Sequence, residues 1–421
     1  MKNRIKIFMY CLAPLLAFCD RQDDPCASND NPPCDSLATF QSKILWYSPI
    51  MADTSEISLD EITIAGDRFF YVRNKEGYAG TITAREINTG KLFWEWGDVN
   101  ISSGSEITSI KVADGKLIVE SWASLFVIDI QTGTTIWASN PTDIGSCGSP
   151  RMNVLGNQIY FVIEDCSIEK KYTALMRTPI SHFAPEQILK IEEPIDTNWV
   201  SGLEPPSLFI GSTGDSLLIF QNRAFRLGSN KDEVELFAYN LNSKSLLWKI
   251  DSLTLEGTSS VNLPIVQGGF VYAIGIRSIH KIDAMSGQRV WSKSFPINSE
   301  HFISSNITIA ENVIFAHPGS NNLYALSAET GSEIWRIGQL GCCGVTGEIQ
   351  YIDQHLYYVT PPFFLDIDTE KAKIVSKNES PLKWGNARST RFAQFTQTIS
   401  SPDNKLLITS DDHYIMAIKV N

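Results

Sequence analysis

The sequence lacks the short patterns on which most metal, redox and hydrolytic sites depend. Its 421 residues contain no Cys-x-x-Cys pair, no His-x-His or His-x-x-x-His spacing and no Gly-x-Ser-x-Gly elbow. These absences remove the usual signals of a zinc site, a thioredoxin-like centre and a hydrolase nucleophile. No glycine-rich loop of the kind that cradles phosphate is present either. The sequence therefore predicts no catalytic residues and no metal ligands.

Clusters of basic residues are also missing. Lys and Arg number 35 against 47 Asp and Glu, which gives a net charge of −12. Binding to nucleic acid depends on clustered Lys and Arg that neutralise phosphates. We therefore expect no nucleic-acid partner.

Long apolar runs are absent outside the N-terminus. Three basic residues precede the apolar run Ile7–Phe18, which ends at Cys19. This is the form of a secretory signal, too short for a membrane-spanning helix of ~20 residues. It resembles a bacterial lipoprotein signal over residues 1–18, with Cys19 as the lipidated residue, although Phe18 stands where a small residue is usual. The alternative is a leader cleaved elsewhere, which would leave a soluble periplasmic protein.

Residues 19–38 are rich in Asp, Asn and Pro and predict a flexible tether. The acidic cluster after Cys19 resembles the surface-export signals of some lipoproteins. We therefore expect an exported protein held at the outer membrane or cell surface by its lipid alone.

Six cysteines remain after Cys11 in the leader and Cys19 are set aside. An even number in an exported chain favours disulfides. Sequence proximity pairs Cys26 with Cys34 and Cys147 with Cys166. Cys342 and Cys343 are adjacent and flanked by Gly, which predicts either a vicinal disulfide or two free thiols. Pairing of Cys147 with one of them is a further alternative.

One pattern is strongly present, and it is a repeat. Leu323–Trp335 reads as strand, tight turn and strand, with Gly331 where a positive φ is tolerated. The same frame recurs at Thr83–Trp94, Phe126–Trp137, Phe237–Trp248 and His280–Trp291, with a degenerate copy at Phe363–Ile374. Trp94 and Trp137 are 43 residues apart, as are Trp248 and Trp291. A period in the low forties in an all-β chain is typical of propeller blades of about four strands.

The two chain ends supply the halves of one more copy. Lys43–Tyr47, which contains Trp46, is the second half of the frame without its first half, and Tyr414–Val420 is the first half without its second. The sequence therefore predicts an all-β fold over residues 39–421. It is an eight-bladed β-propeller of four-stranded antiparallel blades, closed by N- and C-terminal strands that share one blade. Seven blades is the alternative, if blade three or four is not a full sheet.

These residues resemble the repeat of the quinoprotein-type, or PQQ-like, eight-bladed propellers. The Trp of each repeat and the Asp position before its turn, filled by Asp129, Asp283 and Asp366, carry the resemblance. The resemblance implies that each Trp docks against the neighbouring blade; these are Trp46, Trp94, Trp137, Trp248, Trp291 and Trp335.

The family contains quinone-dependent dehydrogenases and non-enzymatic lipoproteins that resemble component B of the outer-membrane β-barrel assembly machinery. A dehydrogenase would need an oxygen-ligand Ca²⁺ site and an Asp base, and the motifs assign neither. Isolated carboxylates such as Asp165 and Glu348 read as turn or solvated residues.

We therefore predict a monomeric, non-enzymatic scaffold without a cofactor. It would bind envelope proteins through propeller loops, above all through the insertions in blades three and four. A PQQ-dependent dehydrogenase is the first alternative. A glycan-binding propeller that uses Trp122, Trp199 or Trp384 is the second.

Overall fold

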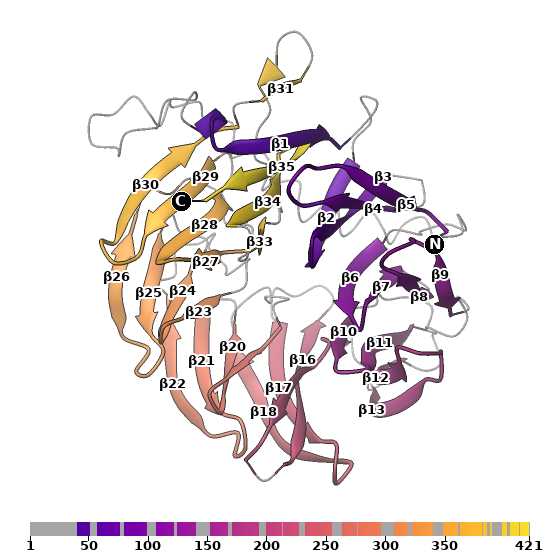
Figure 1. Cartoon of the computed structure of the whole chain (residues 1–421). Coiled ribbons are helices and arrows are strands. Elements are labelled where there is room, and N and C mark those ends of the chain that lie inside the picture. Colours follow the sequence, from indigo (N-terminus) through magenta and orange to yellow (C-terminus); the bar gives the residue numbers. More distant parts are fainter. Residues whose placement is uncertain are drawn as a thin grey trace.

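The structure is a computed structural model in which the chain closes into a ring (Figure 1). The elements of the described residues are strands, numbered β1 to β35, apart from two helical residues, 40 and 41, that precede β1. The described residues are 40–50, 57–75, 80–98, 107–121, 124–139, 152–166, 171–192, 199–212, 214–226, 232–254, 263–275, 277–295, 307–318, 322–338, 340, 348–360, 363–380, 382–384, 388–389, 398–401, 405–411 and 413–420. Among them, no helix is long and apolar enough to cross a membrane.

Eight antiparallel sheets surround the axis of the ring, which confirms the predicted eight-bladed propeller (Figure 1). Seven of the sheets have four strands and one has five. The fifth strand is in blade four, where β14 (Trp199–Leu203) and β15 (Ser207–Ile210) both pair with the long strand β16 (Ser216–Arg226). A separate two-stranded sheet, β31–β32, precedes the last blade.

The first four blades follow chain order from the inner strand to the outer one. Blade one is β2 (Ile57–Ala65), β3 (Arg68–Lys75), β4 (Thr81–Glu86) and β5 (Leu92–Trp96). Blade two is β6 (Ile107–Ala113), β7 (Lys116–Ser121), β8 (Ser124–Asp129) and β9 (Thr135–Ala138). Blade three is β10 (Met152–Leu155), β11 (Gln158–Cys166), β12 (Lys171–Pro179) and β13 (Glu186–Glu192). Blade four is β14 (Trp199–Leu203), β15 (Ser207–Ile210), β16 (Ser216–Arg226), β17 (Asp232–Asn240) and β18 (Ser245–Thr254).

The remaining blades follow the same order until the ring closes. Blade five is β19 (Ile265–Gln267), β20 (Phe270–Ile274), β21 (Ser278–Asp283) and β22 (Arg289–Ser294). Blade six is β23 (Thr308–Ala310), β24 (Val313–Ala316), β25 (Leu323–Ser327) and β26 (Glu333–Ile337). Blade seven is β27 (Gln350–Ile352), β28 (His355–Thr360), β29 (Phe363–Asp368) and β30 (Lys373–Asn378). After the pair β31 (Lys383–Trp384) and β32 (Arg388–Ser389), blade eight is β33 (Thr398–Ser401), β34 (Leu406–Ser410), β35 (Tyr414–Lys419) and β1 (Ile44–Pro49).

Blade eight is built from both chain ends, as the two half-repeats predict. β1 pairs with β35 antiparallel from Ile44 opposite Ile418 to Pro49 opposite Tyr414. The N-terminal strand is the outer strand of this blade, and the C-terminal strand lies inside it (Figure 1). Backbone hydrogen bonds between β1 and β35, rather than a covalent bond, therefore close the ring. They complete the fourth strand of blade eight, so its sheet is as wide as those of the other four-stranded blades.

The turn that connects the third strand of a blade to the fourth is stabilised by the carboxylate at the Asp position of the repeat. In blade two, Asp129 Oδ1 accepts hydrogen bonds from the backbone N–H groups of Gln131 and Thr132, at 2.9 and 2.8 Å. Asp283 accepts in the same way from Ser286 N–H at 2.8 Å in blade five. A short carboxylate that bonds to the backbone two or three residues ahead fixes such a turn.

In blade seven this Asp position is filled by Asp368, and our assignment of Asp366 was wrong by two residues. Asp368 Oδ1 accepts from Lys371 N–H at 2.9 Å, and Asp368 pairs with His355 at the position where Asp129 pairs with Lys116. Asp366 instead lies buried and bonds to His355 Nδ1 at 2.6 Å. Because Asp366 and Asp368 are only two residues apart, the sequence alone did not show which of them occupies the Asp position of the repeat.

This register puts Ser376, eight residues after Asp368, where Trp137 follows Asp129. Blade seven therefore carries no Trp toward blade eight. Phe40, from the N-terminal end, lies in the same joint with 1% of its surface exposed, and its ring is 5.6 Å from that of Phe364. A side chain from the other end of the chain thus fills the joint that the repeat leaves without an indole.

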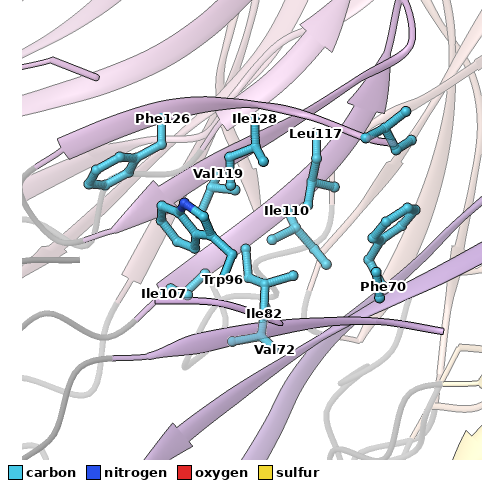
Figure 2. Packing of buried hydrophobic residues seen from close by; sticks show 12 residues of the cluster. Phe70, Val72, Ile82, Trp96, Ile107, Ile110, Leu117, Val119, Phe126 and Ile128 are labelled. Carbon is cyan, nitrogen blue, oxygen red and sulfur yellow. The ribbon is translucent and has the colours of Figure 1, made fainter. Parts of the chain in front are cut away.

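The hydrophobic core is a series of clusters between neighbouring blades. Figure 2 shows the cluster between blades one and two, where Phe70, Val72 and Ile82 face Ile110, Leu117 and Val119. Trp96 closes one side of it, and its ring centroid is 5.1 Å from that of Phe126. Each blade has two apolar faces and cannot bury either one alone, so the blades fold as a closed set.

One histidine is buried within blade five. His280, on β21, is 4% exposed, and its ring nitrogens lie 2.8 Å from the hydroxyl oxygens of Ser278 and Ser292. Burial, with a smaller contribution from Arg289, lowers the pKa of His280 from 6.5 to about 4. The folded protein therefore holds this ring neutral at neutral pH.

The buried His280 predicts a loss of stability in acid. In the unfolded chain this residue takes up a proton near pH 6.5, whereas the folded chain takes it up only near pH 4. The contribution is fully present above pH 6.5 and is lost as the pH falls toward 4, by about 3 kcal/mol. Denaturant titrations between pH 7 and pH 4 should show this loss reduced in His280→Gln. His182→Gln, at an exposed histidine, should keep it. An equal loss in wild type and His280→Gln would contradict the assignment.

Candidate functional site

The inner strands line the axis of the ring and are joined to one another by side chains. Asn153 Nδ2 donates to Pro206 O at 2.9 Å, from blade three to blade four. Thr308 Oγ1 donates to Ile349 O at 2.6 Å, from blade six to blade seven. These residues stand at the same place in their blades, two residues before the last one of the inner strand. The axis is therefore lined by polar links at one level.

At the same level of blades one and two the link is an ion pair. Glu61 lies at an irregularity of β2, between the paired residues Leu59 and Ile62. Its Oε2 accepts from Ile110 N–H at 2.5 Å, and its Oε1 contacts the Lys111 ammonium. A β-bulge turns one side chain out of the normal alternation. Here it turns the carboxylate toward the next inner strand.

A second carboxylate acts on the same lysine from across the ring. Glu348 directly precedes Ile349 of blade seven, as Glu61 precedes Ile62 of blade one. Burial alone would lower the pKa of Lys111, but attraction to Glu61, with smaller contributions from Glu348 and Glu120, raises it above its ordinary value. The protein atoms around the Glu348 carboxyl desolvate it in part, although solvent still reaches its surface, and together with repulsion from Glu61 they raise its pKa against the opposing pull of Lys111. We call Glu61, Lys111, Glu120 and Glu348 the axial cluster.

Within the axial cluster, accessibility to solvent is uneven. Glu348 is exposed to solvent, whereas Glu120 is fully buried. Glu61 has both oxygens engaged by blade two. One ammonium among three carboxyl groups leaves more hydrogen-bond acceptors than donors in the cluster, which favours contact with hydrogen-bond donors. Glu348 is therefore the member that is placed to meet a molecule arriving from solvent.

The charges of the axial cluster bear on whether it could hold a divalent cation. Among the described residues, no group of three or more His, Cys, Asp or Glu side chains could hold a metal ion. Lys111 places a positive charge against Glu61 and within electrostatic range of Glu348, and this charge opposes a divalent cation.

No motif in the sequence pointed to Glu61, Lys111 or Glu348 as site residues. Glu348 was interpreted as an isolated turn or solvated carboxylate. Aligning the blades on the turn after the inner strand would have shown the signal, because Glu61 stands four residues before Ala65 and Glu348 four before Ile352. What no alignment shows is that blades one, two and seven bring their charges together at the axis.

The tryptophans of the repeat lie at the joints between blades. For five of them, the indole nitrogen donates a hydrogen bond to a backbone carbonyl of the following blade: Trp46 to Ile87 (2.7 Å), Trp94 to Ile130 (3.2 Å), Trp137 to Ile180 (2.7 Å), Trp248 to Ala284 (3.0 Å) and Trp291 to Ala328 (3.4 Å). Trp335 packs against Phe315, with ring centroids 5.8 Å apart, in the cluster between blades six and seven. Their contribution to stability stays a prediction.

Most other residues singled out in the sequence lie outside the described residues. These are the proposed lipid-bearing Cys19, the cysteines Cys26, Cys34, Cys147, Cys342 and Cys343, and Trp122. Cys166 ends β11, Trp199 begins β14 and Trp384 ends β31, and for these three only the backbone is described. The lipid anchor, the disulfides and the glycan contacts therefore stay predictions.

A family model described as "Outer membrane protein assembly factor BamB" matches residues 211–420, from blade four to the C-terminal strand. No curated protein matches the chain by sequence.

Solved structures match over most of the ring. The quinohemoprotein alcohol dehydrogenase of Comamonas testosteroni is 9% identical, with a TM-score of 0.61, over 91% of this chain and 77% of that one. Sqt1 of Saccharomyces cerevisiae is 10% identical, with a TM-score of 0.60, over 90% of this chain and 99% of Sqt1. The computationally designed protein Ika8 is 11% identical, with a TM-score of 0.56, over 87% and 97%. Identities this low show the fold alone. Taken with the tryptophan-marked repeat and the eight-bladed ring, the family match shows that the chain belongs to the PQQ-like β-propellers.

Proposed function

We propose that the chain is an exported, lipid-anchored propeller that binds other proteins of the cell envelope and has no enzymatic activity. The match to a family model named for an outer-membrane assembly factor supports a protein-binding role. The basic and apolar leader that ends at Cys19 supports export and anchoring.

The observation that carries the proposal is the unequal length of the strands in adjacent blades. In blades five to eight, the second and third strands are 4 to 6 residues long. In blade three β11 and β12 each have 9 residues, and in blade four β16 has 11 and β17 has 9. The fold of the ring does not require this extra length.

The two long hairpins form one continuous structure on one face of the ring. The same pair of strands is extended in both blades, so both hairpins extend toward the same face. β14 joins them, because it pairs with the outer half of β16 from Trp199 to Leu203 and also contacts β12. Long hairpins supported by a rigid sheet are a common position for binding surfaces. We place the partner-binding surface here.

The test removes the hairpin of blade four without breaking its sheet. Replacing residues 224–233 with Asn-Gly closes β16 onto β17 at the paired residues Arg223 and Val234. The wild-type chain should capture outer-membrane assembly proteins of its host, and the shortened variant should lose that capture at an unchanged melting temperature. Glu329→Lys, a change at an exposed residue in the turn between β25 and β26 of blade six, should leave the capture of these proteins unchanged.

Two further measurements check the remaining parts of the proposal. The mass of the N-terminal peptide should show acylation at Cys19. Stoichiometric binding of a quinone together with alcohol-dependent reduction of a dye would overturn the non-enzymatic proposal in favour of a dehydrogenase. Capture that is equal for the wild-type and shortened chains would move the binding surface away from blades three and four.

A further inference from the structure

The outer strand of each blade has one edge without a neighbouring strand in the described residues. In blade five this strand is β22, which pairs with β21 only. Phe295 N–H donates to Arg277 O at 2.8 Å, toward β21. Because hydrogen-bonding direction alternates along a strand, the N–H of Ser294 faces the open edge. The edge of β22 therefore presents backbone donors and acceptors to solvent.

The charges on β22 distinguish it from the other outer strands. On three other outer strands, the cation has a carboxylate partner: Lys190 with Glu192 (3.0 Å), Lys249 with Glu235 and Asp251 (2.7 and 2.6 Å) and Arg336 with Glu333 (3.9 Å). β22 carries Arg289 and Lys293 and no carboxylate, and neither cation forms an ion pair with a described residue.

Only one other outer strand carries cations without a carboxylate, and it is less accessible. This is β30, with Lys373 and Lys377. Lys377 is 8% exposed and lies 4.2 Å above the ring of Phe363. In β22, by contrast, Arg289 is exposed and Lys293 is partly exposed. β22 is thus the outer strand whose two unpaired cations both reach solvent.

The remaining side chains of β22 leave room for an added strand. Val290 is 50% exposed, and Ser292 and Ser294 are small and exposed. Met285, in the turn that leads to β22, is 39% exposed. Natural sheets protect their edges with proline, with short strands or with charges. Here the protecting charges are both positive, so they repel a basic strand and attract an acidic one.

We propose that the open edge of β22 binds an acidic, extended peptide segment of another protein as a fifth strand of blade five. Backbone hydrogen bonds to the edge would supply affinity, and carboxylates beside Arg289 and Lys293 would supply selectivity. Apolar side chains of the segment would cover Val290. This site is separate from the hairpins of blades three and four, so it goes beyond the function proposed above.

The experiment measures binding of two labelled heptapeptides to the full chain by fluorescence anisotropy. One peptide alternates Glu and Val, and the other alternates Lys and Val. The Glu peptide should bind at least about tenfold more tightly, with an advantage that shrinks at high salt. The double variant Arg289→Glu/Lys293→Glu should reverse this preference. Ser294→Pro removes an outward N–H at a position where an edge strand tolerates proline and should weaken binding about tenfold.

Lys373→Glu, the matched change on β30, should leave both affinities unchanged. Equal affinities for the two peptides, or a preference that the double variant does not reverse, would overturn the proposal. So would equal weakening by Lys373→Glu. If Ser294→Pro fails to fold, the double variant still tests the proposal, because its reversed peptide preference does not depend on Ser294→Pro. Because shortening blade four does not touch β22, failure here leaves the capture experiment above to be judged separately.

Discussion

Replacing Gly331 with Ala is expected to lower the free energy of unfolding by about 3 kcal/mol. Gly331 has φ of +70°, a conformation that L side chains rarely adopt. A Cβ at this position would lie 2.7 and 2.8 Å from ring carbons of Trp291, which belongs to the preceding blade. The cost thus combines local backbone strain with overpacking at the joint between blades five and six. Chemical denaturation of the variant and the wild type measures it.

A matched glycine separates the two causes. Gly156 has φ of +61°, and a Cβ there would meet nothing within 4 Å. Gly156→Ala should therefore cost only the backbone strain, about 1 kcal/mol. Gly331→Ala should also fall to about 1 kcal/mol in a Trp291→Ala background, where the indole is missing. If Gly156→Ala and Gly331→Ala destabilise the protein equally, the docked tryptophan is not what requires glycine.

The chain contains a natural version of this comparison. Gly90, Gly133 and Gly287 each lie against the Trp of the preceding blade, with the nearest ring carbon 2.6 to 2.7 Å from an ideal Cβ. Lys244 occupies the same turn position in blade four with φ of +52°. Blade three, which precedes it, has no Trp in its outer strand. A side chain is therefore tolerated at this turn in blade four, where no indole docks; in blade seven Ala372 fills the position with φ of +50°, although blade six carries Trp335.

Replacing Phe40 with Ala is expected to lower the free energy of unfolding by about 4 kcal/mol. Phe40 is 1% exposed, and it packs on Phe364 in the joint between blades seven and eight. Ser376 stands where other blades have Trp, so no indole is present to compensate for the lost ring. The measurement is the midpoint of denaturant unfolding together with its slope.

Tyr47 is the control for Phe40 because it lies on the same N-terminal segment. It is 55% exposed, and its ring makes an edge contact with Tyr414 at 5.4 Å. Tyr47→Ala should cost less than about 1 kcal/mol. A Phe40→Ala cost as small as that of Tyr47→Ala would show that the N-terminal segment does not stabilise the closure of the ring.

The two anchors of this segment explain why the closing strand is stable. Trp46 faces blade one, where its indole donates to Ile87 O at 2.7 Å and lies against Gly90. Phe40 faces blade seven on the other side. β1 thus contacts the blades on both sides of the one it completes. The half-repeats identified the strand pair in sequence, but Phe40 belongs to no repeat and was not predicted.

Local patterns in the sequence predict the ring. The spacing of Trp94, Trp137, Trp248, Trp291 and Trp335, the turn glycines and the split last repeat indicate blade type and closure, and they favour eight blades over seven. They can do so because each depends on local geometry: strand alternation, a positive φ, and a fixed distance from turn to indole.

Contacts between residues far apart in sequence follow from the closed ring and not from any local pattern. The axial cluster joins Glu61, Lys111 and Glu348 because an eight-bladed ring brings blades one, two and seven to one axis. The replacement of the missing blade-seven tryptophan by Phe40, and the unpaired cations of β22, likewise depend on neighbours supplied by closure. Electrostatic and packing energies depend on distance in space, and the sequence gives distance only along the chain.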